Sequence, residues 1–285
     1  MTTADVVLQA AAGRCELLRA LGAVAYSPPP APDQVTDALS LPRISAADHT
    51  ETFILAAPPH AAIHLNPQGA LGGQGLDRIE GFWRAAGVDP PADADHLGVL
   101  LMCYAGLRDT GADHDRLVAD ALFFEHIWSW AAGYLCAVAD LGCDAITAWA
   151  DLTLAALTEE QPRVRAFGSL PLALRAAPDP LDEACGFDEL LDAVVSPIKC
   201  GMVLTHRALW SGAAAIGVGY RRGERRFALK AMLGQDKRAT LRWLCAHAET
   251  WAIRHGERGD PTSQWWAARA ARSAAVLATL AESAP

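Results

Sequence analysis

The chain lacks the sequence motifs that mark the common nucleotide-binding and hydrolytic enzymes. No G-x-x-x-x-G-K-[ST], G-x-G-x-x-G or G-x-S-x-G occurs among its 285 residues, so the turns of phosphate loops, dinucleotide sites and serine hydrolases are missing. No uninterrupted apolar run approaches the roughly 20 residues that a membrane span needs. We therefore expect no catalytic residue of these classes and no membrane partner.

Basic residues are also in deficit. Lys and Arg number 24 against 33 Asp and Glu, which gives a formal net charge of −9. A nucleic-acid surface needs a basic stripe that displaces counterions, so we predict no nucleic-acid partner. An acidic surface instead suits a partner that carries positive charge.

Cysteine pairs are absent, although the chain has seven cysteines. They are scattered, odd in number and never form C-x-x-C, which indicates small buried thiols in a reducing compartment. The opening M-T-T-A-D-V-V-L-Q-A has no basic segment followed by an apolar run, so no signal peptide is expected. These features predict a cytoplasmic protein.

The residues that are abundant favour helices. Hydrophobic residues make up 52% of the chain, and Ala and Leu outnumber the β-branched residues that lose side-chain freedom in a helix. No convincing alternating strand is found. We predict an all-α fold, a single globular helical domain with a C-terminal helical extension.

Periodicity locates the expected helices. Apolar spacing and stop signals place them near 4–21, 75–86, 94–108, 144–158, 205–217, 223–234, 238–255 and 261–281. A further seam runs through Leu117, Ala121, Phe124, Trp128, Ala131, Leu135 and Val138 in steps of four and three, which predicts one continuous helix in a bundle. Residues 162–187 hold four prolines and two glycines and are expected to cross the surface.

Two short motifs contain groups that could do chemistry. His60 and His64 have metal-ligand spacing if they lie on a helix, but two prolines precede them, L-N-P follows, and no third ligand is near. We therefore expect two loop histidines and no metal site. Asp95 and His96 open a helix and suit either a general acid–base pair or a helix cap above a packed histidine.

A second acid–histidine pair, Glu125 and His126, lies beside Trp128 and Trp130. Spacing alone leaves these four residues as either structural contacts or the lining of a groove.

The order of these motifs resembles the TorD/DmsD/NarJ family, cytoplasmic chaperones that mature molybdenum-dependent oxidoreductases. The likeness rests on a P-P-x-x-x-x-x-L loop in which His60, His64 and Asn66 replace the usual aromatics and acid, on a helix with Phe82, Trp83 and Gly87, and on the D-H-L motif at residues 95–97. The segment F-F-E-H-I-W-S-W resembles another family block. Residues 196–256 resemble the C-terminal part of long-form members that accompany enzymes of the dimethyl-sulfoxide-reductase type.

The resemblance implies a non-catalytic chaperone for a molybdenum-enzyme catalytic subunit. It would bind the twin-arginine signal peptide, assist cofactor insertion and delay export, as a monomer or weak dimer without a cofactor of its own. Residues 1–160 would form the helical core with the peptide-binding loop, and residues 161–285 would pack on the same core. The residues expected to bind the peptide are Pro58, Pro59, His60, His64, Leu65, Asn66, Phe82, Trp83, Asp95, His96, Glu125, His126 and Trp130.

Two alternatives belong to other functional classes. The first is a small-molecule or nucleotide-binding helical protein, including an enzyme that uses the histidine-rich loop. The second is an assembly factor that docks on the mature part of its client and ignores the signal peptide.

Overall fold

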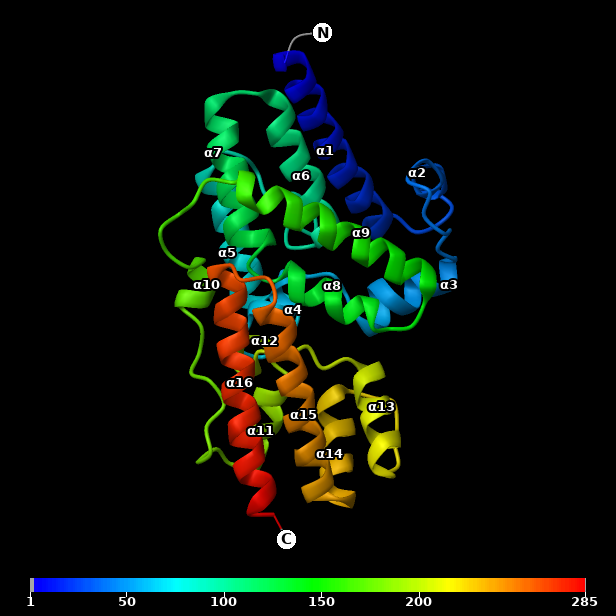
Figure 1. The fold of residues 1–285 in the computed structure, drawn as a ribbon, viewed down its shortest axis with the longest axis vertical. Helices are drawn as coiled ribbons and strands as arrows, with labels where there is room; N and C mark the ends of the chain where they lie inside the picture. Colours follow the sequence, from blue (N-terminus) through cyan, green and yellow to red (C-terminus); the bar gives the residue numbers. More distant parts are fainter. Residues whose placement is uncertain (1–2, 285) are drawn as a thin grey trace. The chain divides into compact units, whose positions relative to one another are not determined.

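The computed structural model describes residues 3–284, and helices dominate this part of the chain (Figure 1). About 69% of the protein is helical, and the described residues contain no strand, only an isolated bridge between His60 and His96. The all-α prediction is confirmed.

The chain divides into two compact units. The first unit comprises the chain up to Ala61 together with Gly72–Ser169, and the second comprises Ala62–Leu71 together with the chain from Leu170 onward. The short segment Ala62–Leu71 therefore groups with residues that follow it by about a hundred positions. The packing of the C-terminal helices on the N-terminal core stays a prediction.

The helices of the first unit include one pair, α1 and α6, that packs unusually closely. They are α1 (Thr3–Tyr26), α2 (Asp33–Ala38), α3 (Ala46–His49), η1 (Thr50–Ala56), α5 (Gly73–Ala85), α6 (Leu97–Thr110), α7 (Asp113–Ala121), η2 (Leu122–Ile127), α8 (Ala131–Ala139), α9 (Asp144–Glu160) and η3 (Gln161–Arg163). Helices α1 and α6 touch at Gly22 and Gly98, where a Cβ on Gly22 would lie 2.6 Å from the Gly98 carbonyl oxygen. The indole of Trp149 ties α9 to the end of α1 by donating to the Leu21 carbonyl at 3.0 Å.

The continuous helix predicted along the 117–138 seam is wrong. Helix α7 ends at Ala121, the π-helix η2 follows, and a turn separates it from α8. A π-helical turn contains more residues than an α-turn, so the alternation of three and four loses its phase. Leu117 is consequently 50% exposed, whereas Trp128 and Leu135 are buried as expected.

The second unit contains the most regular pair of helices. Its elements are α10 (Leu172–Arg175), α11 (Phe187–Val194), α12 (Pro197–Cys200), α13 (His206–Ile216), α14 (Arg225–Gln235), α15 (Lys237–Gly256) and α16 (Pro261–Glu282). Figure 1 shows α15 and α16 side by side. Their N-terminal N–H groups are capped by the carboxylates of Asp236 and Asp260, as expected where an acid precedes a helix.

The stretch predicted as a surface excursion, 162–187, is partly anchored. It includes the single turn α10 and the buried side chains of Leu174 and Leu181. Arg269 of α16 donates to the Pro178 carbonyl at 2.9 Å. The part of this stretch from Leu170 onward belongs to the second unit, where buried leucines and bonds to backbone carbonyls hold it.

Helix α4 (Ala61–Leu65) is a single turn within the segment predicted as a loop. The two prolines do not prevent it, because they precede its first residue and proline is tolerated before a helical turn begins. Its first residue belongs to the first unit and the rest to the second.

Candidate functional site

Two segments far apart in sequence meet in the first unit. The Leu97 N–H donates to the Pro59 carbonyl at 2.7 Å, and the Ala61 N–H donates to the Asp95 carbonyl at 3.0 Å. His60 and His96 form an antiparallel bridge between these bonds. We call the paired segments, residues 59–61 and 95–97, the clasp. It joins the proline loop and the D-H-L motif, both of which were predicted to belong to the binding site.

The side chains of the clasp form a hydrogen bond. His60 Nδ1 lies 2.9 Å from Asp95 Oδ1. The Asp95 side chain is only 5% exposed and that of His60 is 20% exposed. The Asp95 carboxylate thus points at His60 and does not face an open groove, so its geometry suits holding the loop more than meeting a peptide directly.

Helix α6 is capped by a histidine, so the alternative of an aspartate cap is excluded. His96 is the N-cap residue, and its Nδ1 accepts a hydrogen bond from the Gly98 N–H at 3.0 Å. Burial, assisted by the charge of His60, lowers the pKa of His96 to about 4. The ring is therefore neutral near pH 7, as an accepting nitrogen requires. The interpretation that an aspartate caps this helix was wrong.

A second carboxylate near the clasp faces outward. Asp93 is exposed and has a positive φ of 51°, a conformation that Asp tolerates better than most residues. Its side chain accepts a hydrogen bond from the Tyr26 hydroxyl at 3.3 Å. Of the Asp93-x-Asp95 pair, Asp93 is the one that solvent or a ligand can reach.

A second group of predicted residues gathers where α5 meets η2. The rings of Phe82 and His126 lie 4.8 Å apart, and Trp130 donates from its indole to the His126 carbonyl at 2.7 Å. Trp83, His126 and Trp130 are buried, whereas Phe82 and Glu125 are partly exposed. Only the latter two lie where a groove could use them.

His126 is kept neutral by this packing. Burial, with a smaller contribution from the positive charge of Arg78, lowers its pKa to about 3. Two nearby donors on α5, Arg78 Nη1 and Trp83 Nε1, are buried without a hydrogen-bond partner among the described residues. The group is thus a packed aromatic cluster in which two polar atoms lack their usual partners.

The remaining predicted residues, His64, Leu65 and Asn66, belong to the second unit. All three are buried. The Asn66 side chain donates to the Ala70 carbonyl at 3.1 Å, and the Ser196 hydroxyl donates to the Asn66 carbonyl at 3.2 Å. Burial and the charge of Arg225 lower the pKa of His64 to about 3. These residues stabilise a turn of the second unit and do not present a surface.

No metal centre is found within residues 3–284, where no group of three or more His, Cys, Asp or Glu side chains is arranged to hold an ion. His60 and His64 lie in different units, and His60 is paired with a carboxylate.

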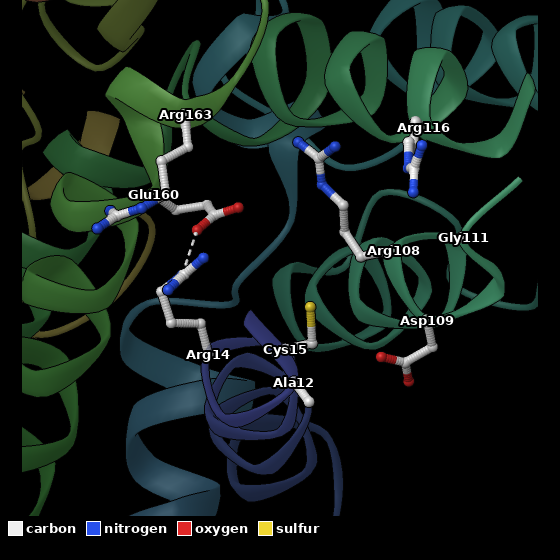
Figure 2. A pocket seen from close by; sticks show the side chains of 9 residues that line it. All are labelled: Ala12, Arg14, Cys15, Arg108, Asp109, Gly111, Arg116, Glu160 and Arg163. Atoms are coloured by element: carbon white, nitrogen blue, oxygen red, sulfur yellow. Dashed lines mark hydrogen bonds and ion pairs between the residues drawn. The ribbon is translucent and has the colours of Figure 1, made fainter. Parts of the chain in front are cut away.

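The first unit also contains a pocket whose residues no sequence motif indicated (Figure 2). Its volume is about 400 Å³, and it is lined by Ala12, Arg14, Cys15, Arg108, Asp109, Gly111, Arg116, Glu160 and Arg163. These residues come from α1, from the end of α6, from α7 and from the junction of α9 with η3. No local motif could have revealed them, because the pocket exists only where these elements converge.

Ion pairs order the walls of the pocket. Arg14 Nε lies 3.3 Å from Glu160 Oε2, and Tyr104 donates to the other oxygen of Glu160 at 2.6 Å. Arg108 donates to Tyr104 Oη at 2.9 Å and to Asp120 at 2.5 Å. Burial raises the pKa of Cys15, and the charges of Asp109 and Glu160 raise it further. The Cys15 thiol is therefore protonated near pH 7 and is not an activated nucleophile.

The N-terminal part of the chain is similar to a known protein family. Residues 11–135 match the family model described as nitrate reductase delta subunit. This segment contains the clasp and the aromatic cluster, and it covers less than half of the chain. The match supports the NarJ/TorD-type chaperone family, whose members mature molybdenum enzymes and are not catalysts.

Two further findings accompany the delta-subunit match. No curated protein matches the chain. Among the described residues, no helix is both long and apolar enough to cross a membrane. The match supports a chaperone role in molybdoenzyme maturation, with a molybdoenzyme catalytic subunit as the kind of partner.

Proposed function

We propose that the protein binds the twin-arginine signal peptide of a molybdenum-enzyme catalytic subunit in the cytoplasm and delays export until the cofactor is inserted. We further propose that it is a long-form relative of the TorD/DmsD branch. The delta-subunit match supports the chaperone role, and the clasp supports this choice of ligand.

The observation that carries the proposal is the bonding of the clasp. Two backbone hydrogen bonds and the His60–Asp95 pair hold the proline loop against the start of α6. A loop that is fixed before binding loses little entropy when a ligand docks. The clasp therefore prepares the residues on either side of it for recognition.

The residues on either side of the clasp have the chemistry that such a peptide requires. Ile54 and Leu55 precede the loop and are 61% and 56% exposed, while Asp93 precedes the D-H-L motif and is also exposed. A twin-arginine peptide joins two guanidinium groups to an apolar helical segment, so it needs carboxylate acceptors and an apolar surface. We assign the arginine contact to Asp93 and a positioning role to Asp95.

Calorimetric titration with a synthetic twin-arginine peptide tests this assignment. Asp93→Asn should weaken binding about tenfold, because one charge-assisted hydrogen bond is lost. Asp89→Asn removes an exposed carboxylate four positions away and serves as the matched control with unchanged affinity. Equal affinities of wild type and Asp93→Asn would overturn the assignment of the arginine contact.

A second comparison distinguishes the signal peptide from the mature client. A peptide with both arginines replaced by lysine should bind about tenfold more weakly, since ammonium groups cannot form the planar fork. A client subunit truncated at its N-terminus should lose most of its affinity. If the truncated client binds as tightly as the full subunit, the protein is an assembly factor for the mature part of its client.

A further inference from the structure

The pocket of Figure 2 is rich in arginine, unlike the chain as a whole. Four of its nine lining residues are arginines, and two are carboxylates, Asp109 and Glu160. The chain as a whole carries a net charge of −9. Each of the four arginines is paired with a carboxylate: Arg14 with Glu160, Arg108 with Asp120, Arg116 with Asp113 and Arg163 with Glu159. The pocket therefore offers an anion guanidinium donors rather than a large net charge.

Several guanidinium nitrogens at the pocket remain available. Within the described part of the chain, Arg14 bonds only through Nε to Glu160, and Arg116 bonds only through one terminal nitrogen to Asp113. Arg108 uses Nε and Nη2 for Tyr104 and Asp120, and its Nη1 makes no such bond. The ion pairs therefore orient these side chains without consuming all of their donors.

The donors come from opposite walls. Figure 2 shows Arg14 and Glu160 on one side and Arg108 and Arg116 on the other. A planar carboxylate is satisfied by one guanidinium fork, whereas a phosphate group offers acceptors in several directions. Donors that converge from different helices therefore favour a phosphate group over a carboxylate.

We infer that this pocket is a binding site for a phosphate-bearing small molecule. Its volume of about 400 Å³ lies within the range of small-molecule sites. Arg14, Arg108 and Arg116 would bind the phosphate oxygens. Asp109, whose Oδ2 pairs with Arg19, would accept a hydrogen bond from a hydroxyl or amine of the same ligand through its other oxygen. No covalent step is involved, because the Cys15 thiol stays protonated and the ligand is only bound.

The site is independent of the proposed peptide surface. None of its lining residues belongs to the clasp or to the outward-facing residues Ile54, Leu55 and Asp93. Loss of phosphate binding would therefore leave the affinity for the signal peptide unchanged, and the two proposals can fail separately.

Titration of the full-length protein with inorganic pyrophosphate at low ionic strength tests the inference. Arg14→Gln and Arg116→Gln should each weaken binding about tenfold. Asp109→Asn should tighten binding about threefold, since it removes a negative charge from the pocket wall. Arg43→Gln is the matched control with unchanged affinity, because Arg43 is 62% exposed, pairs with Asp33 and Asp37, and lies outside the pocket.

Two results would overturn the inference. One is the absence of binding to wild type at pyrophosphate concentrations up to about 10 mM, beyond which affinity is negligible. The other is an equal loss of pyrophosphate affinity in Arg43→Gln and in the pocket variants, which would show that pyrophosphate binds to any surface arginine. Melting curves accompany each variant. If an arginine variant fails to fold, the increase in pyrophosphate affinity expected for Asp109→Asn tests the inference instead. Misfolding cannot cause tighter binding.

Discussion

The two units of the chain bury histidines in opposite ways. In the first unit the neutral ring of His96 accepts a hydrogen bond from the α6 backbone, so protonation would break that contact. In the second unit His255 Nε2 lies 3.1 Å from the Gly201 carbonyl, where it acts as a donor, so protonation would preserve the bond. Burial lowers the pKa of both rings to about 4. A buried histidine is therefore acid-sensitive where it caps α6 and only desolvated where it lies in the last turn of α15.

The units also differ in regularity. The first contains two π-helical segments and the clasp, whereas the second is built on α15 and α16, each capped by an aspartate. π-Helical turns are frequent at functional sites, where they orient particular side chains. Regular, capped helices instead supply a rigid scaffold. The proposed peptide surface and the proposed phosphate site both lie in the less regular first unit.

The largest expected effect concerns the buried indoles of the two units. Trp128→Ala should cost about 3–5 kcal/mol of unfolding free energy, as for a large aromatic removed from a packed core. Trp251→Ala serves as the matched change in the second unit, where the residue is 1% exposed against 4% for Trp128. Denaturant unfolding followed by circular dichroism measures both. If Trp128→Ala unfolds like wild type, the assignment of this residue to the core is wrong.

The next largest loss of stability is expected where a glycine of the second unit packs closely against another backbone segment. A Cβ at Gly201 would lie 2.3 Å from the Ala270 nitrogen, and its φ is +76°. Gly201→Ala should therefore cost about 2–3 kcal/mol through overpacking and strain.

Gly217 provides the control for that change. It has nearly the same φ, +74°, but nothing lies within 4 Å of a Cβ built there. Gly217→Ala should cost only about 1 kcal/mol. Equal losses of melting temperature in the two variants would show that the close approach of Gly201 to α16 does not limit stability.

A smaller effect is expected at the caps. Asp260 accepts hydrogen bonds from the N–H groups of Thr262 and Ser263 at the start of α16. Asp260→Ala should cost about 1 kcal/mol, and Asp260→Asn should restore most of it, because Asn is also a good cap. Thermal melts of both variants test this, and an Asn variant as unstable as the Ala variant would assign the loss to charge instead.

The change in stability that is smallest at neutral pH concerns His96 and its contrast with His255. The pKa of His96 falls from an ordinary value of 6.5 to about 4 on folding. Its contribution to stability is therefore complete above pH 6.5 and is lost as the pH falls toward 4, where the unfolded state binds more protons. His96→Asn keeps a capping side chain and removes the titration, so stability should depend less steeply on pH in this window. An unchanged slope would show that other buried groups dominate the acid sensitivity.

Helix positions were largely predictable because their causes are local. The expected helices at 144–158, 205–217, 238–255 and 261–281 lie within about two residues of α9, α13, α15 and α16. Asp236 and Asp260 also precede their helices as caps should. The seam at 117–138 failed because heptad spacing cannot detect an inserted π-turn.

The candidate site was only partly predictable. Sequence reasoning named both arms of the clasp through the proline loop and the D-H-L motif, and the structure joins them. It did not show that Asp95 is buried while Asp93 is exposed, since both belong to one short polar segment. It also grouped His64 and Asn66 with His60, although the chain changes units between them.

Composition and local spacing by themselves determined the helical class and the ends of several helices, because propensity and capping act over a few residues. Tertiary structure alone decided that Asp95 holds His60 and that arginines from separate helices surround one pocket. These outcomes depend on contacts between residues distant in sequence. Such contacts form only when packing brings their helices together, and no local pattern records them.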